Sequence, residues 1–385
     1  MTGARNGRHG GCEVSLFLQD LDGGGAERAL VSLAGAIARE GFAVDLVVGE
    51  TKSNLYGEIP REVKVVDFAT RSPLRILPQL IAYLRKQNPR TVVSALDLAN
   101  IMLIIAAALA GYRGRVVVSQ RAVVDASLDD LPAVRRMITR FLLRICMTRA
   151  DAVISNSHAA AADVKATFDI DAGKVTIIPN AVDVERIGSL ARQPIKGDFA
   201  EASEQRLIVS VGSLTRRKDV PTLLRAFKIV TAQMPARLVV VGEGPERRSI
   251  EALIAELGLT GTVRLTGFDA NPYAWMAAAT VVVSASTGEG FPNVIAEALA
   301  LGRSVVATDC PGDTAELLER GKWGRLVPVG DHAAMAAAIL AALDESNPPD
   351  GRVRAADFAP SKTTASYLAV LLGTPDRSAA SIRGF

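Results

Sequence analysis

The chain has 385 residues, of which 49% are hydrophobic, and it carries 44 Lys and Arg against 41 Asp and Glu, a net charge of +3. This length fits two domains better than one, and the slight basic excess does not indicate a nucleic-acid-binding protein. The three cysteines, Cys12, Cys146 and Cys310, are widely spaced and predict neither a disulfide framework nor a zinc site. We therefore expect a protein of the reducing cytoplasm with no nucleic-acid partner.

Neither the N-terminus nor the most apolar segment predicts insertion into a membrane. Residues 1–12 lack the apolar core that a signal peptide needs, so we interpret them as a flexible N-terminal extension. The longest apolar run, residues 101–112, is too short to cross a bilayer and predicts a buried helix. The chain is therefore expected not to span a membrane.

Strand-like and helix-like segments alternate along the chain from residue 13. Residues 13–19 are rich in β-forming side chains, residues 20–25 form a glycine turn, residues 26–40 have helical apolar spacing, and residues 42–49 are again β-like. The same order recurs from residue 207. These two starts predict an α/β fold with two Rossmann-like parallel-sheet domains facing a cleft, in which ligands bind beyond the carboxyl ends of the strands.

The patterns divide the chain into five parts. Residues 184–204 are rich in charge, Gly, Pro and Ser and are interpreted as a linker. The other parts are the extension (1–12), a first Rossmann-like domain (13–183), a second one (205–360), and a C-terminal helix and tail (361–385) that can pack back on the first domain. Further strands are predicted at residues 91–96, 116–120, 152–157, 175–179, 237–244, 263–268, 281–286 and 304–309.

The stretch "TGEGFPNVIAEALA", residues 287–300, combines a glycine-rich loop with a helix. Pro292 is predicted at the first helical position, which tolerates its missing N–H. The first free backbone donors, on Asn293, Val294 and Ile295, should point toward the loop with the positive end of the helix dipole behind them. A phosphate is the ligand that such a helix start favours.

Two carboxylates in this stretch, Glu289 in the loop and Glu297 on the helix, lie eight positions apart, so they are predicted to contact different parts of one elongated ligand. Each can accept paired hydrogen bonds from vicinal hydroxyls, which suits a sugar and a ribose on opposite sides of a diphosphate. The alternative is that both are ordinary solvated residues. The apolar neighbours Ala296, Ala298 and Leu299 of Glu297 favour the functional interpretation.

These residues closely resemble the retaining glycosyltransferases of family 4, a GT-B group whose signature is a Glu, seven residues and a second Glu. The likeness covers most of the chain and includes the segments "GGAER" (24–28), "ADAVISNS" (150–157), "KVTIIPNAVD" (174–183), "VGSLTRRKD" (211–219), "VVVGEGPE" (239–246) and "GRLVPVGD" (324–331). The resemblance implies that the first domain binds the acceptor and the second domain binds the donor.

The resemblance also implies the roles of individual residues. Glu289 would contact hydroxyls of the donor sugar and Lys218 would neutralise the diphosphate, so these two are the implied catalytic residues. Glu297 would bind the ribose, and the backbone of Phe268 would contact the base. The other implied donor-binding residues are Gly24 and Gly25 in the first glycine loop, together with Arg217, Gly290, Phe291, Asn293 and Val294.

The chain departs from the family pattern at two places. Many members have an Arg where this chain has Ser213, and either Arg216 or Arg217 could replace that charge, unless this is only a solvated basic loop. Many members also have a His after the first-domain strand at residues 116–120, and this chain has none there. Gln120 or Arg121 is the candidate for that position on the acceptor side.

The resemblance implies retaining transfer of a sugar from a nucleotide-sugar, expected to be UDP-linked, to a glycan or to a polyprenyl or other lipid-linked acceptor. Cell-surface polysaccharide or glycolipid synthesis, at the inner face of the cytoplasmic membrane, would fit such an enzyme. No metal or other cofactor is expected, because the helix start at Asn293 and Val294, the cation of Lys218 and the amides of Gly24 and Gly25 would supply positive potential around the diphosphate. No catalytic base is needed if the departing phosphate accepts the acceptor proton, and electrostatic stabilisation of that leaving group would then supply most of the rate.

Other functions remain open at this point. The "DLD" string at residues 20–22 matches the letters of a metal-dependent glycosyltransferase motif, although the glycines after it favour a phosphate-facing turn. A Rossmann dehydrogenase would need a third glycine that neither "GGGAER" nor "GEGPER" supplies. A GT-B sugar-nucleotide epimerase or a non-catalytic sugar-nucleotide-binding protein is the main alternative.

One further segment, residues 135–149, has the pattern of a helix that meets a membrane surface. On a helix Arg136, Arg140 and Arg144 form one stripe, with Met137, Phe141 and Ile145 beside it, which suits an anionic membrane and peripheral contact. The alternative is a helix that packs its apolar side on the sheet and leaves its arginines in water.

Overall fold

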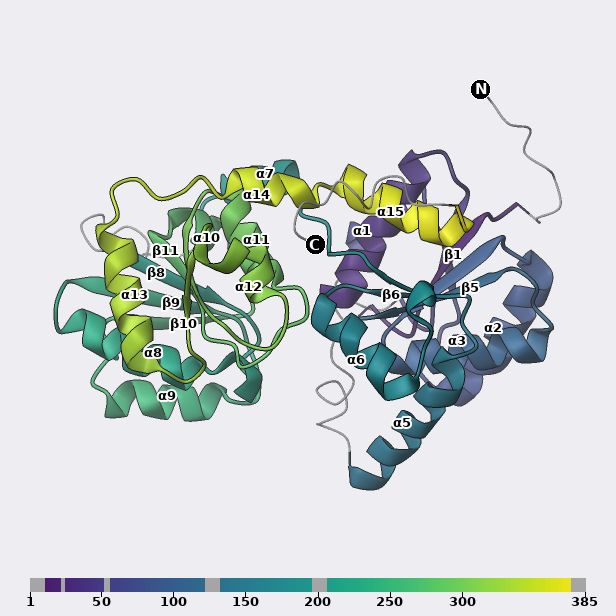
Figure 1. Ribbon diagram of the computed structural model, residues 1–385, viewed down its shortest axis with the longest axis horizontal. Helices are drawn as coiled ribbons and strands as arrows, with labels where there is room; N and C mark the ends of the chain where they lie inside the picture. Colours follow the sequence, from purple (N-terminus) through teal and green to yellow (C-terminus); the bar gives the residue numbers. More distant parts are fainter. Residues whose placement is uncertain (1–10, 22–24, 52–55, 122–131, 196–205, 375–385) are drawn as a thin grey trace. The chain divides into compact units, whose positions relative to one another are not determined.

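The structure is a computed structural model of the chain, and it describes residues 11–21, 25–51, 56–121, 132–195 and 206–374 (Figure 1). The described residues form two compact units. The first ends at Ala181 and the second begins at Val182, and the chain returns to the first unit at Pro360. Each unit is built on one parallel sheet, as the sequence predicts.

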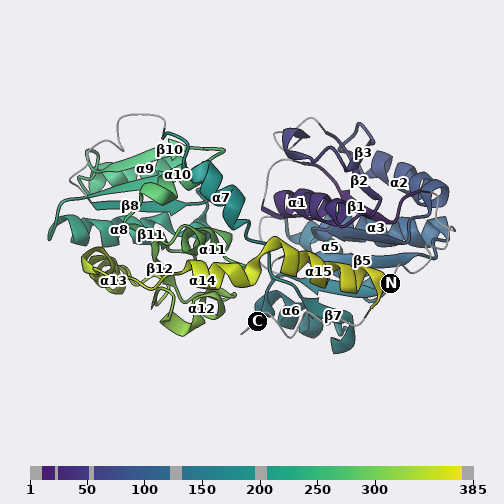
Figure 2. The same cartoon turned by 90° about the horizontal axis from the view of Figure 1, so that it is seen from above.

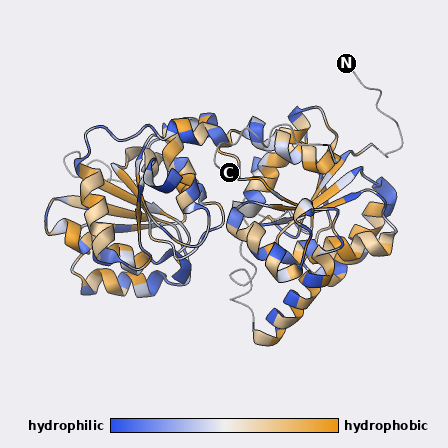
Figure 3. Cartoon of the chain, in the orientation of Figure 1, coloured by the Kyte–Doolittle hydropathy of each residue, from blue (hydrophilic) through white to orange (hydrophobic). Residues whose placement is uncertain are grey.

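The first unit contains a seven-stranded parallel sheet in the order β3-β2-β1-β4-β5-β6-β7. Its central strands are buried along their whole length, because helices cover both faces of the sheet. They appear as hydrophobic ribbons in Figure 3. The strands are β1 (Val14–Leu18), β2 (Val44–Val48), β3 (Lys64–Asp67), β4 (Thr91–Ala95), β5 (Arg115–Gln120), β6 (Ala152–Ser155) and β7 (Val175–Ile177).

The helices of the first unit form two layers, one on either side of the sheet in Figure 1, and Figure 2 looks down on the layer that contains the C-terminal helix. One core cluster contains side chains from α2 (Pro73–Gln87), α3 (Asp97–Ala110), α5 (Ala133–Met147) and α6 (His158–Phe168). The other contains side chains from α1 (Gly25–Arg39) and from the C-terminal helix α15 (Pro360–Leu372). Thr91 Oγ1 donates to Leu371 O at 2.6 Å and Arg115 Nε donates to Val370 O at 2.8 Å, which fixes the end of α15 near the starts of β4 and β5.

The second unit contains a six-stranded parallel sheet in the order β10-β9-β8-β11-β12-β13. This is the order of a Rossmann sheet, in which the chain reverses direction across the sheet between its first and fourth strands, here β8 and β11. Ligands of such sheets bind beyond the carboxyl ends of those two strands. The strands are β8 (Arg206–Val211), β9 (Ala236–Val241), β10 (Val263–Gly267), β11 (Val281–Ser284), β12 (Ser304–Thr308) and β13 (Arg325–Val327).

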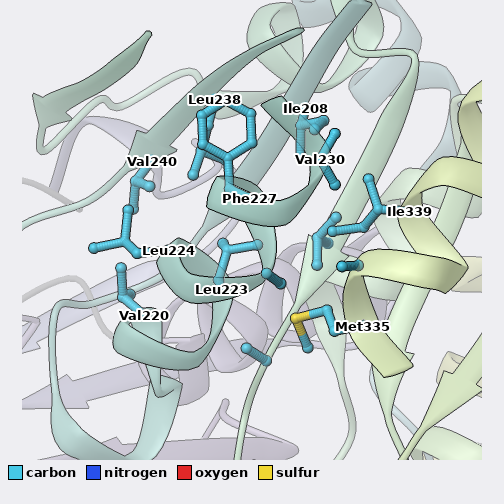
Figure 4. Close-up of a cluster of buried hydrophobic side chains, with 14 of the residues drawn as sticks. Ile208, Val220, Leu223, Leu224, Phe227, Val230, Leu238, Val240, Met335 and Ile339 are labelled. Atoms are coloured by element: carbon cyan, nitrogen blue, oxygen red, sulfur yellow. The ribbon is translucent and has the colours of Figure 1, made fainter. Parts of the chain in front are cut away.

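Helices also cover both faces of the second sheet. Figure 4 shows Phe227 and Leu223 of α8 (Val220–Thr231) in one buried cluster with Met335 and Ile339 of α13 (His332–Asp344) and with Ile208 of the sheet. The opposite core cluster contains side chains of α7, α10, α11, α12 and α14. The remaining helices are α7 (Val184–Ala191), α9 (Arg247–Glu256), α10 (Pro272–Ala278), α11 (Asn293–Ala300), α12 (Thr314–Leu317) and α14 (Arg352–Ala355).

The structure corrects the interpretation of residues 184–204 as a linker. Residues 184–191 form α7, because Asp183 caps the helix start through its side chain and Ile187 is buried in the core of the second unit. Asn271 Nδ2 donates to Leu190 O at 2.9 Å and fixes the helix end. Charge in this segment therefore marks the outer face of an amphipathic helix rather than a free connection.

Two strands were not predicted, and one helix starts a residue later than predicted. β3 and β13 are the short edge strands of their sheets, with three or four residues and little full burial. Pro292 is the residue before α11 rather than its first residue. None of the helices in the described ranges is long and apolar enough to cross a membrane.

Candidate functional site

Two loops meet at the carboxyl ends of β8 and β11. The loop after β8 contains a short 3-10 turn, η4 (Arg216–Lys218), and the loop after β11 leads to α11. The backbone N–H of Thr287 donates to Arg217 O at 2.8 Å, so the two loops are tied together directly. Residues 70 positions apart in sequence thus share one edge of the second sheet.

Glu289 is the centre of a charged cluster in these loops. Lys218 Nζ lies 2.5 Å from its Oε1, and Arg217 Nη1 lies 3.1 Å from its Oε2. Ser286 Oγ donates to Oε1 at 2.6 Å. The Glu289 side chain is 11% exposed, against 18% for Lys218 and 48% for Arg217, so Lys218 is the shielded cation and Arg217 the accessible one.

These contacts determine the charge of Glu289. Burial alone would raise the pKa of its carboxyl group, but the positive charges of Lys218 and Arg217 and the hydrogen bonds from Lys218 and Ser286 outweigh it. The pKa of Glu289 therefore lies below its ordinary value of 4.5. The side chain is an ionised hydrogen-bond acceptor at neutral pH and has no proton to give as an acid.

The loop after β12 holds the backbone of Glu289. The backbone N–H of Glu289 donates to Pro311 O at 2.9 Å, and Thr308 Oγ1 donates to Ser286 O at 2.5 Å. Gly312 has a φ of +133°, and a Cβ atom at that position would collide with the Glu289 carbonyl group. A side chain at position 312 would therefore displace the loop that carries Glu289. Neither Ser286 nor Gly312 was singled out from the sequence, although a serine directly after a buried strand is a signal for a site residue.

A small pocket lies beside the charged cluster. Its walls include the hydroxyl-bearing residues Ser210, Ser284 and Ser286 together with Lys218 and Gly212. A Cβ atom on Gly212 would come within 3.1 Å of Lys218 Cε, so a glycine there leaves room for the lysine side chain. Lys218 thus borders both the pocket and the carboxylate.

Glu297 lies on α11 and is partly exposed. Tyr273 Oη donates to its Oε1 at 3.2 Å, and the flanking Ala296 and Ala298 are buried. The apolar neighbours therefore face the core, as the sequence indicates, and Glu297 is on the opposite side of the helix. Its partner Tyr273 was not identified from the sequence.

The backbone donors at the start of α11 differ from the prediction of three free N–H groups. The Asn293 N–H donates to Phe291 O at 3.0 Å and the Ile295 N–H donates to Pro292 O at 3.0 Å. No backbone carbonyl of the described residues accepts a hydrogen bond of this kind from the Val294 N–H. Local turn geometry thus uses two of the three donors, and Val294 is the best placed of them for a ligand.

The other predicted donor-binding residues have different surroundings. Phe291 is buried, with its ring 5.3 Å from that of Phe358, so its side chain supports the core. Gly290 O accepts from the Asp313 N–H at 3.2 Å. Phe268, directly after β10, is 64% exposed.

The glycine loop of the first unit is only partly described. Gly25 is the first residue of α1, whereas Gly24 and the second aspartate of the "DLD" string lie outside the described residues.

Only one of the two arginines that could replace the family's Arg joins the cluster. Arg217 contacts Glu289, and its Nη1 also donates to Gly288 O at 2.9 Å. The Arg216 side chain is 95% exposed and lies 3.5 Å from Glu246. Arg216 therefore corresponds to the solvated basic loop, and Arg217 is the candidate substitute.

The two residues predicted on the acceptor side belong to the first unit. Gln120 is the last residue of β5 and is buried. Arg121 follows it, and its guanidinium donates to Asn180 Oδ1 at 2.5 Å and to Tyr367 Oη at 3.1 Å. Both residues therefore lie at the carboxyl end of β5, the edge where a parallel sheet binds its ligands.

Comparison with known proteins identifies relatives for both units. The family profile described as Glycosyltransferase Family 4 matches residues 23–186, and the profile described as Glycosyl transferases group 1 matches residues 205–345. The N-acetylgalactosamine-N,N'-diacetylbacillosaminyl-diphospho-undecaprenol 4-alpha-N-acetylgalactosaminyltransferase of Campylobacter jejuni is 29% identical over 343 residues, covering 86% of this chain and 90% of that protein. The lipopolysaccharide core biosynthesis glycosyltransferase LpsE of Rhizobium meliloti is 26% identical, covering 82% and 84%.

A solved structure shares the fold. HepE of Anabaena, crystallised with UDP and glucose, superimposes with a TM-score of 0.77 at 20% identity, covering 94% of this chain and 99% of HepE. Two parallel Rossmann-like sheets, profile matches on both halves and relatives that span most of the chain all agree. The chain therefore belongs to the family 4 type of glycosyltransferases and is an enzyme with the GT-B fold.

Proposed function

We propose that this enzyme transfers a sugar from a nucleotide-sugar donor, a UDP-sugar, with retention of anomeric configuration and without a metal ion. The observation that supports this most is the cluster of Lys218, Arg217 and Glu289 beyond the carboxyl ends of β8 and β11. The cluster lies at the point where Rossmann sheets bind nucleotides. Its two cations can bind a diphosphate, and its carboxylate can accept hydrogen bonds from sugar hydroxyls. The UDP of the HepE structure is consistent with such a donor.

In the proposed reaction Lys218 and Arg217 bind the diphosphate, and the Val294 N–H at the start of α11 assists them. Glu289 orients the donor sugar through its hydroxyls, and Glu297 binds the ribose. The bond between the anomeric carbon and the diphosphate oxygen breaks while the acceptor oxygen bonds to the same face of that carbon. The leaving phosphate takes the acceptor proton, so stabilisation of its charge by the cations lowers the barrier.

The proposed acceptor is a glycan or a polyprenyl or other lipid-linked sugar, in the synthesis of a cell-surface polysaccharide or glycolipid. Two relatives support this by their names, one with a diphospho-undecaprenol acceptor and one in lipopolysaccharide core synthesis. Arg121 and Gln120 are the proposed acceptor-side residues, since they lie at the ligand-binding edge of the first sheet.

We expect a product of retained configuration, formed at an undiminished rate in excess EDTA. The test combines a panel of UDP-sugars with glycan and prenyl-diphosphate-linked acceptors, mass spectrometry of the products, and NMR coupling at the new anomeric centre. An inverted product, or activity that EDTA abolishes and Mg²⁺ or Mn²⁺ restores, would contradict the mechanism. Conversion of the donor without any acceptor would indicate an epimerase. Binding of the donor without turnover would indicate a non-catalytic binding protein.

Peripheral contact with the membrane is proposed through α5. Several large apolar side chains on this helix are exposed, Met137 at 66%, Phe141 at 62% and Ile138 at 50%. The apolar side chains that pack on the core come from its C-terminal half, Leu143 and Met147 among them. The alternative of a helix whose apolar side is entirely packed on the sheet therefore does not describe α5.

Charge decides which partner fits this surface. Residues 133–147 of α5 contain four arginines, including Arg136, Arg140 and Arg144, and no acidic residue. Exposed apolar side chains beside arginines are complementary to an anionic bilayer, in which the apolar groups enter the interface and the guanidinium groups meet lipid phosphates. A lipid-linked acceptor would then be presented at the same surface as the enzyme.

We expect sedimentation with phosphatidylcholine vesicles to rise strongly when about a third of the lipid is phosphatidylglycerol, because each arginine near the surface adds about 1 kcal/mol. Replacing Arg136, Arg140 and Arg144 by Gln should abolish that rise, and Met137→Ser with Phe141→Ser should reduce binding further.

A matched control variant removes three exposed cations of the second unit, Arg320, Lys322 and Arg352, and should bind the vesicles as the wild type does. Equal binding of both triple variants would refute the proposal.

A further inference from the structure

Arg121 is a cation at the edge of the first sheet, and none of the described residues supplies a carboxylate partner for it. Its guanidinium is only partly exposed, and it donates to two neutral oxygens, Asn180 Oδ1 at 2.5 Å and Tyr367 Oη at 3.1 Å. Its Nε atom is buried without a hydrogen-bond partner. Within the described ranges no carboxylate forms an ion pair with Arg121.

Two other shielded arginines, Arg354 and Arg115, each have a compensating negative group. The buried Arg354 pairs with Asp357 and Glu319. Arg115, at the opposite end of β5, reaches the carbonyl of Val370 near the C-terminal end of α15, where the helix dipole is negative. Within the described ranges, Arg121 has neither a carboxylate nor a helix C-terminus to compensate its charge. A partly desolvated cation held by neutral groups is unfavourable unless an anion completes the site.

The surroundings of Arg121 add further polar groups. Residues alternate between the two faces of β5, and Val117 lies in the core cluster beneath α1 and α15, so Ser119 and Arg121 continue on that face. Ser119 Oγ is buried and has no hydrogen-bond partner among the described residues.

The helix α15 brings a second hydroxyl to the same end of the strand. The start of β5 contacts Val370 and its carboxyl end contacts Tyr367, so earlier residues of α15 lie further toward the ligand-binding edge. Thr363 precedes Tyr367 by one helical turn on the same side of α15. Its Oγ1 is also buried without a partner in the part of the chain that the structure describes.

We infer that Arg121 binds an anionic group of the acceptor substrate, a phosphate or a carboxylate. Asn180 and Tyr367 hold the guanidinium in one orientation, and the Ser119 and Thr363 hydroxyls supply further donors on the same face. This inference rests on the proposed function, because the acceptor is the substrate assigned to the first unit. It names the acceptor's chemical class: an anionic molecule, not a neutral glycan.

The inference is tested by calorimetric titration of the full chain with inorganic pyrophosphate and, separately, with malonate, in the presence of saturating UDP. Because UDP occupies Lys218 and Arg217, any further anion binding reports another site. We expect one such site. Pyrophosphate should bind it more tightly than malonate if the acceptor carries a phosphate, and malonate should bind more tightly than pyrophosphate if the acceptor carries a carboxylate. Arg121→Gln should weaken the preferred anion at least about tenfold, the loss expected when a charged hydrogen-bond donor is removed.

Two controls separate anion binding from packing. Arg115→Gln also removes an arginine that contacts α15, and it should retain the anion site. Tyr367→Phe removes a neutral bond to Arg121 but keeps its charge, and it should bind the anion within about threefold of the wild type. UDP affinity should be the same in all variants.

The outcomes are distinguishable. Absence of a second anion site in the wild type, or equal anion binding by wild type and Arg121→Gln, would overturn the inference and leave the proposed function intact. Failure of the wild type to bind UDP at all would instead contradict the proposed function.

Discussion

Replacing Lys218 by Met is expected to lower kcat by at least about a hundredfold. Its ammonium group is the more shielded of the two cations beside Glu289, with 18% of the side chain exposed against 48% for Arg217. A positive charge in a water-poor site stabilises a developing oxyanion far more than an exposed one does, and removal of one such group costs about 3 to 4 kcal/mol. Arg217→Gln should therefore reduce kcat less than Lys218→Met does.

The measurement is steady-state turnover with the donor at saturation, so that weaker donor binding is separated from slower chemistry. Arg216→Gln is the matched control, because Arg216 lies in the same turn but is 95% exposed and paired with Glu246. It should retain nearly full activity. If Arg217→Gln were the more damaging change, the phosphate-binding cation would be assigned to the wrong residue.

Lys218→Met also removes one partner of a shielded ion pair. Glu289 would then keep Arg217 and Ser286, so its negative charge would still be compensated in part. We expect a measurable fall in Tm with retained cooperative unfolding, and a thermal melt recorded beside the kinetics distinguishes this effect from lost catalysis. A variant that is folded at the assay temperature and inactive supports the catalytic role.

The central strands of both sheets could be predicted because they are buried on both faces and are therefore continuously apolar. β11 shows this in the second sheet, with residues 281–283 buried, whereas β8 was recognised from a shorter apolar run of which only Ile208 and Val209 are buried. The position of the site beyond the carboxyl ends of these two strands follows from the parallel order of the sheet. β3 and β13 were not predicted, since these short edge strands have few buried positions and their apolar residues are interrupted by charges such as Lys64 and Arg325. The equally short edge strand β7 was predicted because the run at residues 175–179 carries no charge. α7 was not recognised because its eight residues include Glu185, Arg186 and Gly188, and Ile187 alone among them is fully buried.

The candidate site was predictable where each of its residues stands in a recognisable sequence motif. Glu289 and Lys218 lie in recognisable loops, and the structure brings them together. The choice of Arg217 over Arg216 depends on the η4 turn, after which Asp219 has a φ of 40°. Contacts such as Arg121 with Tyr367, which are 246 positions apart, depend on where α15 packs. No local pattern encodes such a distance.

Replacing Glu289 by Gln is expected to lower kcat on the order of a hundredfold and, at the same time, to tighten the binding of free UDP. The carboxylate holds Lys218 at 2.5 Å and Arg217 at 3.1 Å, so it neutralises the cations that a diphosphate would need. Gln has nearly the same shape without the charge. At roughly 1 kcal/mol for a charge near the protein surface, UDP affinity should rise about fivefold.

Glu297→Gln provides the contrasting control. Glu297 accepts a hydrogen bond from Tyr273, whereas the two cations pair with Glu289, so loss of the charge at position 297 should not strengthen diphosphate binding. If it binds the ribose, UDP binding should weaken instead. The two isosteric changes are therefore predicted to move the UDP dissociation constant in opposite directions, which calorimetry with UDP alone can measure without any acceptor.

Acid stability gives an independent check on the charge of Glu289. Its pKa is lower in the folded protein than its ordinary value of 4.5, so its ion pairs stabilise the folded state fully above that value. This contribution is lost as pH falls through the folded pKa. Melts recorded from about pH 7 down to about pH 3 should therefore show a smaller acid-induced loss of stability in Glu289→Gln than in the wild type. Identical acid profiles, together with unchanged UDP affinity, would mean that Glu289 does not carry the charge that balances Lys218 and Arg217.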